Sequence, residues 1–103
     1  MLVIKPTEDD PGRFILAGSF DISTADLLFD MVDPVVVEER DITLDLDGVV
    51  FIDSYGFGAL VLAAVALQPN ARLILIGLRG MVLDVVEQGR LDRVFSNVLI
   101  ESG

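Results

Sequence analysis

Apolar residues along this chain fall into short runs that are separated by polar turns and follow two periodicities. Strands are predicted at 2–5, 13–17, 42–46, 49–52 and 72–76, with a last strand or terminal segment at 94–100. Helical spacing predicts three helices: one after residue 24, one over 55–67, and one over 81–88 with Gly89 at its C-cap. Because alternating strands and helices favour parallel crossovers, we expect a single α/β domain over residues 1–103. Its sheet should be mixed and mostly parallel, with four to five strands covered by three to four helices.

Two interruptions are predicted in the first half of the chain. Ser23 or Thr24 should cap the first helix, whose buried face is expected to hold Leu27, Leu28, Met31, Val32, Val35 and Val36. Pro34 lies inside this pattern and should kink or restart the helix, because proline has no N–H and clashes with the preceding turn. Asp47 and Gly48 are expected to form a turn between two strands.

The second predicted helix has no polar face. No charged residue occurs from Ser54 to Ala71, and the central run is apolar all round. The run is too short to span a membrane, which needs about 20 apolar residues. It is therefore either buried on two sides or presents an outer face to a partner, and we expect the second arrangement. Alanines should make that outer face smooth: Ala59, Ala63, Ala64 and Ala66.

Charge and composition narrow the function. The net charge is −10, and all of this excess lies in residues 1–53, which hold 13 acids and 3 bases. Such a surface repels phosphate backbones and anionic lipid, so we expect neither nucleic acid nor membrane insertion. A basic protein partner fits better, although the acids could also serve only to keep the domain in solution. The first residues do not form a signal peptide, so a cytoplasmic protein is expected.

The junction around Ser54 is the main candidate for chemistry. An apolar run ends in Asp53 and Ser54, then passes through Gly56 and Gly58 into the second helix. Serine at a helix start is expected to cap it by accepting from free backbone N–H groups of the first turn. The same position leaves the hydroxyl near the surface, where a partner protein could reach it.

Catalytic uses of this junction are not supported. The chain has no histidine and no cysteine, which removes His-dependent triads, thiolate chemistry and common zinc sites. Position 52 is Ile where a nucleophile elbow needs Gly, and the only lysine, Lys5, is far from any phosphate-binding loop. Asp45, Asp47 and Asp53 are more simply solvated acids or caps than a cation site. We expect no enzyme activity, no metal and no cofactor.

Residues 42–46 form an apolar strand-like segment, and in residues 49–60 Phe-Ile-Asp-Ser is followed by Gly. These two segments resemble the central motif of the STAS domain family, specifically of bacterial anti-sigma factor antagonists. The segment 16–25, an apolar strand leading through Gly and Asp to Thr-Ala, is similar to the family's first conserved segment. Residues 73–77 and 82–95 are similar to its closing strand and helix, so the resemblance covers nearly the whole chain.

The resemblance implies a regulator of transcription that works by partner switching. Such an antagonist binds an anti-sigma factor, usually also a serine kinase, and so frees a sigma factor. Phosphorylation of Ser54 by the kinase would end this binding, and a phosphatase would restore it. The implied partner-binding residues are Asp21, Ser23, Thr24, Asp53, Ser54, Tyr55, Gly56, Phe57 and Gly58. Tyr55 stands where the family commonly has a small Ser or Thr.

A second function stays open. The chain could be a STAS-like accessory domain that is not phosphorylated, and that binds a small ligand or assembles into a sensory or transport complex. The oligomeric state is also open, a homodimer included. Phosphorylation of Ser54 by a serine kinase would favour the first function, and ligand-induced stabilisation without phosphorylation would favour the second.

Overall fold

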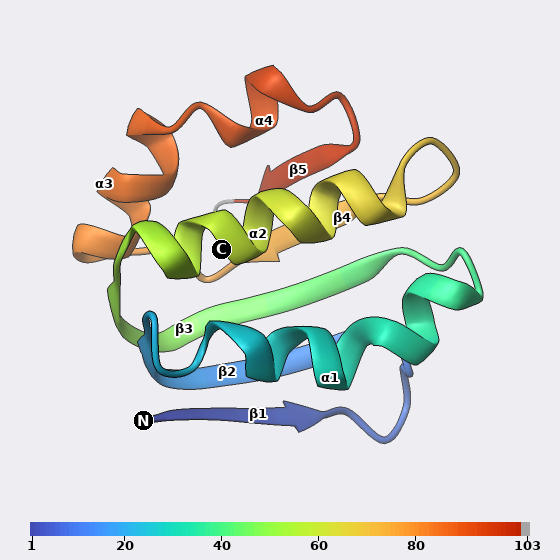
Figure 1. Ribbon diagram of the computed structural model, residues 1–103, viewed down its shortest axis with the longest axis horizontal. Helices are drawn as coiled ribbons and strands as arrows, with labels where there is room; N and C mark the ends of the chain where they lie inside the picture. The colour runs from blue at the N-terminus through green and yellow to red at the C-terminus, as the bar shows by residue number, and fades with distance from the viewer. Residues whose placement is uncertain (102–103) are drawn as a thin grey trace.

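The computed structural model describes residues 1–101, which form one five-stranded sheet with four helices (Figure 1). In chain order the elements are β1 (Leu2–Pro6), β2 (Arg13–Phe20), α1 (Ala25–Val37), β3 (Ile42–Ile52), α2 (Ser54–Leu67), β4 (Leu73–Ile76), α3 (Gly80–Gln88), α4 (Leu91–Val94) and β5 (Val98–Glu101). The strand order is β1-β2-β3-β4-β5, with β1 antiparallel to β2 and every other pair parallel. The predicted α/β class with a mixed, mostly parallel sheet is confirmed.

The helices cover one face of the sheet. Figure 1 shows α1 lying in front of β2, with α2 beside it in front of β4. α1 also contacts β1 and β3, and α2 contacts β3 and β4. Alternate strand residues point into the core between sheet and helices, and the largest fully buried side chains are Phe20, Leu16, Leu28, Ile42, Leu44, Leu46, Ile52, Leu60, Leu73, Leu75, Leu91 and Val32. Burial of these apolar side chains is the main stabilising term. It also fixes the strand register, because a slip of one residue would turn the buried side chains of that strand to the outside.

The predicted turn at Asp47 and Gly48 is wrong. These residues lie inside β3, which is one continuous strand of 11 residues. Opposite β2 the register passes from Ile15↔Asp45 to Ala17↔Gly48, so β3 has one extra residue here and forms a bulge. A second extra residue follows where the register passes from Gly18↔Val49 to Ser19↔Phe51. Gly48 suits the first of these positions, since a Cβ there would lie 2.9 Å from the Ala17 Cβ. A bulge therefore accommodates the pair that the sequence pattern assigned to a turn.

Two helix predictions also need correction. α1 does not restart at Pro34 but continues to Val37, so the missing N–H removes one backbone bond without ending the helix. On α2, Ala59, Ala63 and Ala64 are buried rather than exposed, and only Ala66 lies outside. Bulkier apolar residues form the outer face of this helix. That outer face includes Tyr55, Leu62 and Val65.

The C-terminal third differs from its prediction in one element. The third helix and its C-cap at Gly89 lie as predicted. Residues 94–100, however, do not form one strand, because the short helix α4 occupies Leu91–Val94 before β5 begins at Val98. Within residues 1–101, no helix is both long enough and apolar enough to cross a membrane.

Candidate functional site

The loop between β2 and α1 is held by a network of short side-chain hydrogen bonds. The Asp21 carboxylate accepts from the Ser23 hydroxyl at 2.6 Å and from the Ser23 backbone N–H at 3.0 Å. The buried Thr24 hydroxyl accepts from the Asp21 N–H at 3.0 Å and lies 2.8 Å from the Ser19 carbonyl, to which it donates. Thr24 occupies the N-cap position of α1, but its hydroxyl makes no capping bond to that helix. These residues shape the loop rather than cap the helix.

Hydrogen bonding also stabilises the charged form of the Asp21 carboxyl in this loop. The Ser23 hydroxyl lowers the pKa of the Asp21 carboxyl below its usual value, helped by the Ser23 N–H and the Thr24 hydroxyl and opposed by desolvation. Asp21 is therefore ionised at neutral pH. A fixed negative charge lies at the entrance to α1.

Asp53, not Ser54, caps α2. Its Oδ1 accepts from the backbone N–H groups of Tyr55 and Gly56, both at 2.9 Å. Its Oδ2 accepts from the Ile22 N–H at 3.3 Å, which ties the β2–α1 loop to the start of α2. The prediction of a Ser54 cap is therefore wrong, because the carboxylate one residue earlier satisfies the orphan donors of the first turn.

Ser54 is consequently the first residue of α2 and is exposed. Its hydroxyl forms no hydrogen bond within residues 1–101. The backbone N–H groups of Tyr55, Gly56 and Ile22, in contrast, all donate to the Asp53 carboxylate. A free hydroxyl at a helix N-terminus is accessible to another protein. The positive end of the helix dipole favours negative charge at this position.

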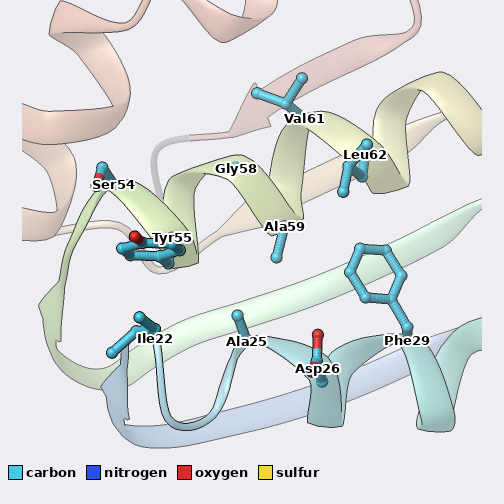
Figure 2. Close-up of a pocket in the computed structure, with 10 residues that line it drawn as sticks. All are labelled: Ile22, Ala25, Asp26, Phe29, Ser54, Tyr55, Gly58, Ala59, Val61 and Leu62. Atoms are coloured by element: carbon cyan, nitrogen blue, oxygen red, sulfur yellow. The ribbon is translucent and has the colours of Figure 1, made fainter.

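An apolar groove of about 590 Å³ runs between α1 and α2 and has Ser54 at one end. Figure 2 shows the residues that line it: Ile22, Ala25, Asp26, Phe29, Ser54, Tyr55, Gly58, Ala59, Val61 and Leu62. The Phe29 side chain points from α1 toward α2, and the Tyr55 ring lies over Ile22 at the other end (Figure 2). Ile22, Tyr55 and Leu62 are each about three-fifths exposed, so the groove is open to a partner.

A second hollow of about 280 Å³ lies on the other side of Ser54, between α2 and α3. Its lining is Ile52, Asp53, Ser54, Phe57, Val85 and Gly89. The Phe57 ring lies so close to Gly89 that a Cβ on Gly89 would fall 2.2 Å from it. Ser54 therefore stands on a ridge between two apolar hollows and lines both of them.

The two glycines at the start of α2 have different surroundings. A Cβ on Gly56 would lie 2.1 Å from the Phe20 carbonyl oxygen, so glycine allows α2 to approach the end of β2. A Cβ on Gly58 would meet nothing within 4 Å, and Gly58 lines the open groove. Gly56 thus serves the packing of the fold, while Gly58 lies on the accessible surface.

The structure brings all nine predicted site residues to one end of the molecule, although their roles differ. Ser54, Tyr55 and Gly58 face the groove; Asp53 and Phe57 line the second hollow; Asp21, Ser23, Thr24 and Gly56 hold the loop and the helix in place. Sequence reasoning missed Ile22, Asp26, Phe29 and Leu62, which complete the groove. The apolar Ile22 within a polar loop was the available signal. Residues 1–101 contain no group of three or more carboxylates placed to hold a metal ion.

Several solved protein structures superimpose on this chain over most of its length. A candidate anti-sigma factor antagonist from Thermotoga maritima superimposes with a TM-score of 0.75 at 24% identity, covering 99% of this chain and 86% of that one. An anti-sigma factor antagonist from Mycobacterium paratuberculosis gives a TM-score of 0.70 at 20% identity, with 96% and 84% covered. The anti-sigma factor antagonist SpoIIAA in its unphosphorylated form gives 0.63 at 15% identity, with 91% and 97% covered.

At these identities the structural likeness establishes a shared fold. A search among curated protein sequences finds no match. The sequence model of the STAS domain, in contrast, matches residues 3–102, which is almost the full length of the chain. The resemblance read from the Asp53–Ser54 motif is thereby confirmed, and the chain belongs to the STAS domain family.

Proposed function

We propose that this protein is an anti-sigma factor antagonist that binds an anti-sigma factor with serine kinase activity and is switched off by phosphorylation of Ser54. It acts by binding rather than by catalysis, in the cytoplasm, and a phosphatase resets it. The fold shared with antagonists of this kind supports the proposal. The observation that carries it is the state of Ser54, which is exposed, free of hydrogen bonds within residues 1–101, and placed between two apolar hollows.

Phosphorylation at this position would change the surface without breaking the fold. A phosphate adds about −1.5 to −2 charges at neutral pH. The N-terminus of α2 tolerates this charge, with a favourable dipole interaction of about 0.3–1 kcal/mol. Because Asp53 already holds the helix end, the phosphate displaces no capping bond.

The partner interface, in contrast, would be strongly affected. The phosphate would lie between the two hollows and beside the carboxylate of Asp53, which lines the second hollow. A partner that fills either hollow would then meet added bulk and negative charge. Burying an unpaired charge in an interface costs several kcal/mol, enough to release the partner.

The test uses the anti-sigma factors with serine kinase domains encoded in the source genome. Incubation of each with this protein and ATP should add one phosphoryl group, located on Ser54 by tandem mass spectrometry. Calorimetric titration should show binding of the unmodified protein and of Ser54→Ala, and at least about a hundredfold weaker binding of Ser54→Asp. Equal affinity of Ser54→Asp and wild type would contradict the proposal.

The groove supports a second candidate function, the binding of a small apolar ligand. Its volume of about 590 Å³ falls within the range of small-molecule sites. In this case a thermal-shift screen with small amphipathic compounds should raise the melting temperature. Leu62→Ala, which enlarges the groove, should alter the response, and no kinase should modify Ser54.

A further inference from the structure

The face of the sheet opposite the helices is a surface that the proposed function leaves unused. Its residues alternate with the buried ones along all five strands, with two exposed residues in succession at the irregular end of β3: Val3, Lys5, Arg13, Ile15, Ala17, Thr43, Asp45, Asp47, Val50, Phe51, Ile74, Ile76, Leu99 and Glu101. Val3, Ile15 and Leu99 are between 40% and 44% exposed. We call this set the open face. A surface patch of a few hundred Å² that exposes several large apolar side chains is often functional.

The charge of the open face differs from that of the rest of the molecule. It carries two bases, Lys5 and Arg13, and three acids, Asp45, Asp47 and Glu101. Asp47 forms an ion pair with Arg79, so these five residues and Arg79 together have a formal charge of zero in a chain of net charge −10. The other four charged residues of the face take part in no salt bridge within residues 1–101. The long-range repulsion that separates two acidic copies is therefore weakest when these faces meet.

The strand register arranges these charges symmetrically. Lys5 pairs with Ile15, Ile15 with Asp45, Asp45 with Ile76, and Ile76 with Glu101, so the five residues form one row across the sheet. The row begins with a base on β1 and ends with an acid on β5. A two-fold axis parallel to the strands, passing over β3, places β1 of one copy over β5 of the other.

We propose that the open face binds a second copy of this chain in this face-to-face arrangement. Lys5 of each copy then lies over Glu101 of the other, and Ile15 lies over Ile76, at the spacing of about 10 Å that stacked sheets adopt. Asp45 lies over its own symmetry mate near the axis. Arg13 lies on β2 diagonally across from Asp45, because it pairs with Thr43, two residues before Asp45. In the dimer its side chain then lies near the Asp45 carboxylates of both copies.

The size of the face sets the strength of the association. Five strands about 4.8 Å apart, with three rows of side chains along them, give a footprint of roughly 400 Å² per copy. This is about half of a standard interface, which buries about 800 Å² per partner. The dimer is therefore weak and depends on concentration. The inference does not rest on the proposed function, since the groove and Ser54 lie on the helical side.

Sedimentation velocity over two decades of protein concentration tests the proposal. Wild type should pass from monomer to dimer. Ile15→Glu should weaken the dimer by about tenfold or more, because it introduces a charge opposite Ile76. The matched control is Val37→Glu at the end of α1, where an equally apolar and still more exposed residue lies outside the open face. It should dimerise as wild type does.

Charge reversal tests the orientation. Lys5→Glu and Glu101→Lys should each weaken the dimer several-fold, and the double variant should restore it, because the exchanged charges face each other across the two-fold axis. Circular dichroism and thermal melting of each variant verify that the exposed substitutions leave the fold intact. A wild type that stays monomeric at every concentration overturns the proposal. So does a dimer that is insensitive to Ile15→Glu, or a double charge reversal that fails to restore association.

Discussion

Substitution of the two glycines of α2 by alanine should change stability in opposite directions. Both residues lie in the same helix two positions apart, so the helical preference of alanine, about 0.5–1 kcal/mol over glycine, contributes to both variants. At Gly58 nothing lies within 4 Å of the new methyl group, and the gain is realised. Gly58→Ala is therefore expected to be about 0.5–1 kcal/mol more stable than wild type.

At Gly56 the same methyl group collides with backbone. It would lie 2.1 Å from the Phe20 carbonyl oxygen and 2.9 Å from Ile52 Cγ1. The Phe20 oxygen also accepts a hydrogen bond from the Asp53 N–H, so it cannot move without loosening the start of α2. Overpacking of this kind costs about 1–3 kcal/mol. Because the helical preference largely cancels between the two variants, their difference in stability measures this close approach.

Urea denaturation followed by circular dichroism measures both free energies of unfolding. A difference of about 1–3 kcal/mol, with Gly58→Ala the more stable variant, corresponds to melting temperatures separated by roughly 5–20 °C in a domain of this size. If both variants change stability in the same direction and by the same amount, the close packing of Gly56 on β2 is refuted. The Gly58 methyl group also enters the groove, so this more stable variant should bind a protein partner less tightly.

Three further predictions concern the site and its charges. Asp53→Ala should lower the free energy of unfolding by about 1–2 kcal/mol, since it removes the helix cap and the hydrogen bond from the Ile22 N–H. Ser54→Ala should change this free energy by less than about 0.5 kcal/mol, and chemical denaturation compares the two variants. Tyr55→Ala should leave the melting temperature near wild type but weaken partner binding by about tenfold or more, as calorimetry would show, because an exposed tyrosine in a groove is a typical energetic anchor. The Ser23 hydroxyl lowers the pKa of Asp21 from 3.8, and the Arg72 backbone N–H lowers the pKa of Asp41 from the same value. Both ionised carboxylates therefore stabilise the fold above pH 3.8, and this stabilisation is lost as the pH falls below it. Urea midpoints measured from pH 5 to pH 2 should therefore fall, and less steeply in a variant with Asn at both positions; an unchanged slope would exclude these two carboxylates as the cause.

The elements that the sequence predicted well are those in which local pattern and tertiary burial agree. The alternation in β1 and β2 and the period of α3 each identify one buried face, and these elements lie close to their predicted positions. Asp47 and Gly48 misled the prediction because the same dipeptide suits a turn and a bulge. Only the pairing of β3 with β2 distinguishes the two.

The site was predicted in place but not in detail. The junction motif located Ser54, yet the choice of Asp53 as cap depends on the backbone geometry at the end of β3 and on the nearby Ile22 N–H. The outer face of α2 was equally ambiguous, since a helix without charged residues has no pattern that orients it. Its orientation is set by contacts with the sheet, which bury Leu60 and Ala64 and leave Leu62 outside. The groove follows from that orientation.

The capping of α2 by Asp53 has a consequence for the amount of protein in the cell. Intracellular proteases act mainly on unfolded chains, so a modification that shifts the unfolded fraction also changes protein lifetime. Because the Ser54 hydroxyl forms no hydrogen bond within residues 1–101 and Asp53 holds the helix end, phosphorylation of Ser54 should leave turnover nearly unchanged. The cellular pool would then stay constant while its active share varies, and the response would follow the balance of the modifying enzymes without a delay for new synthesis.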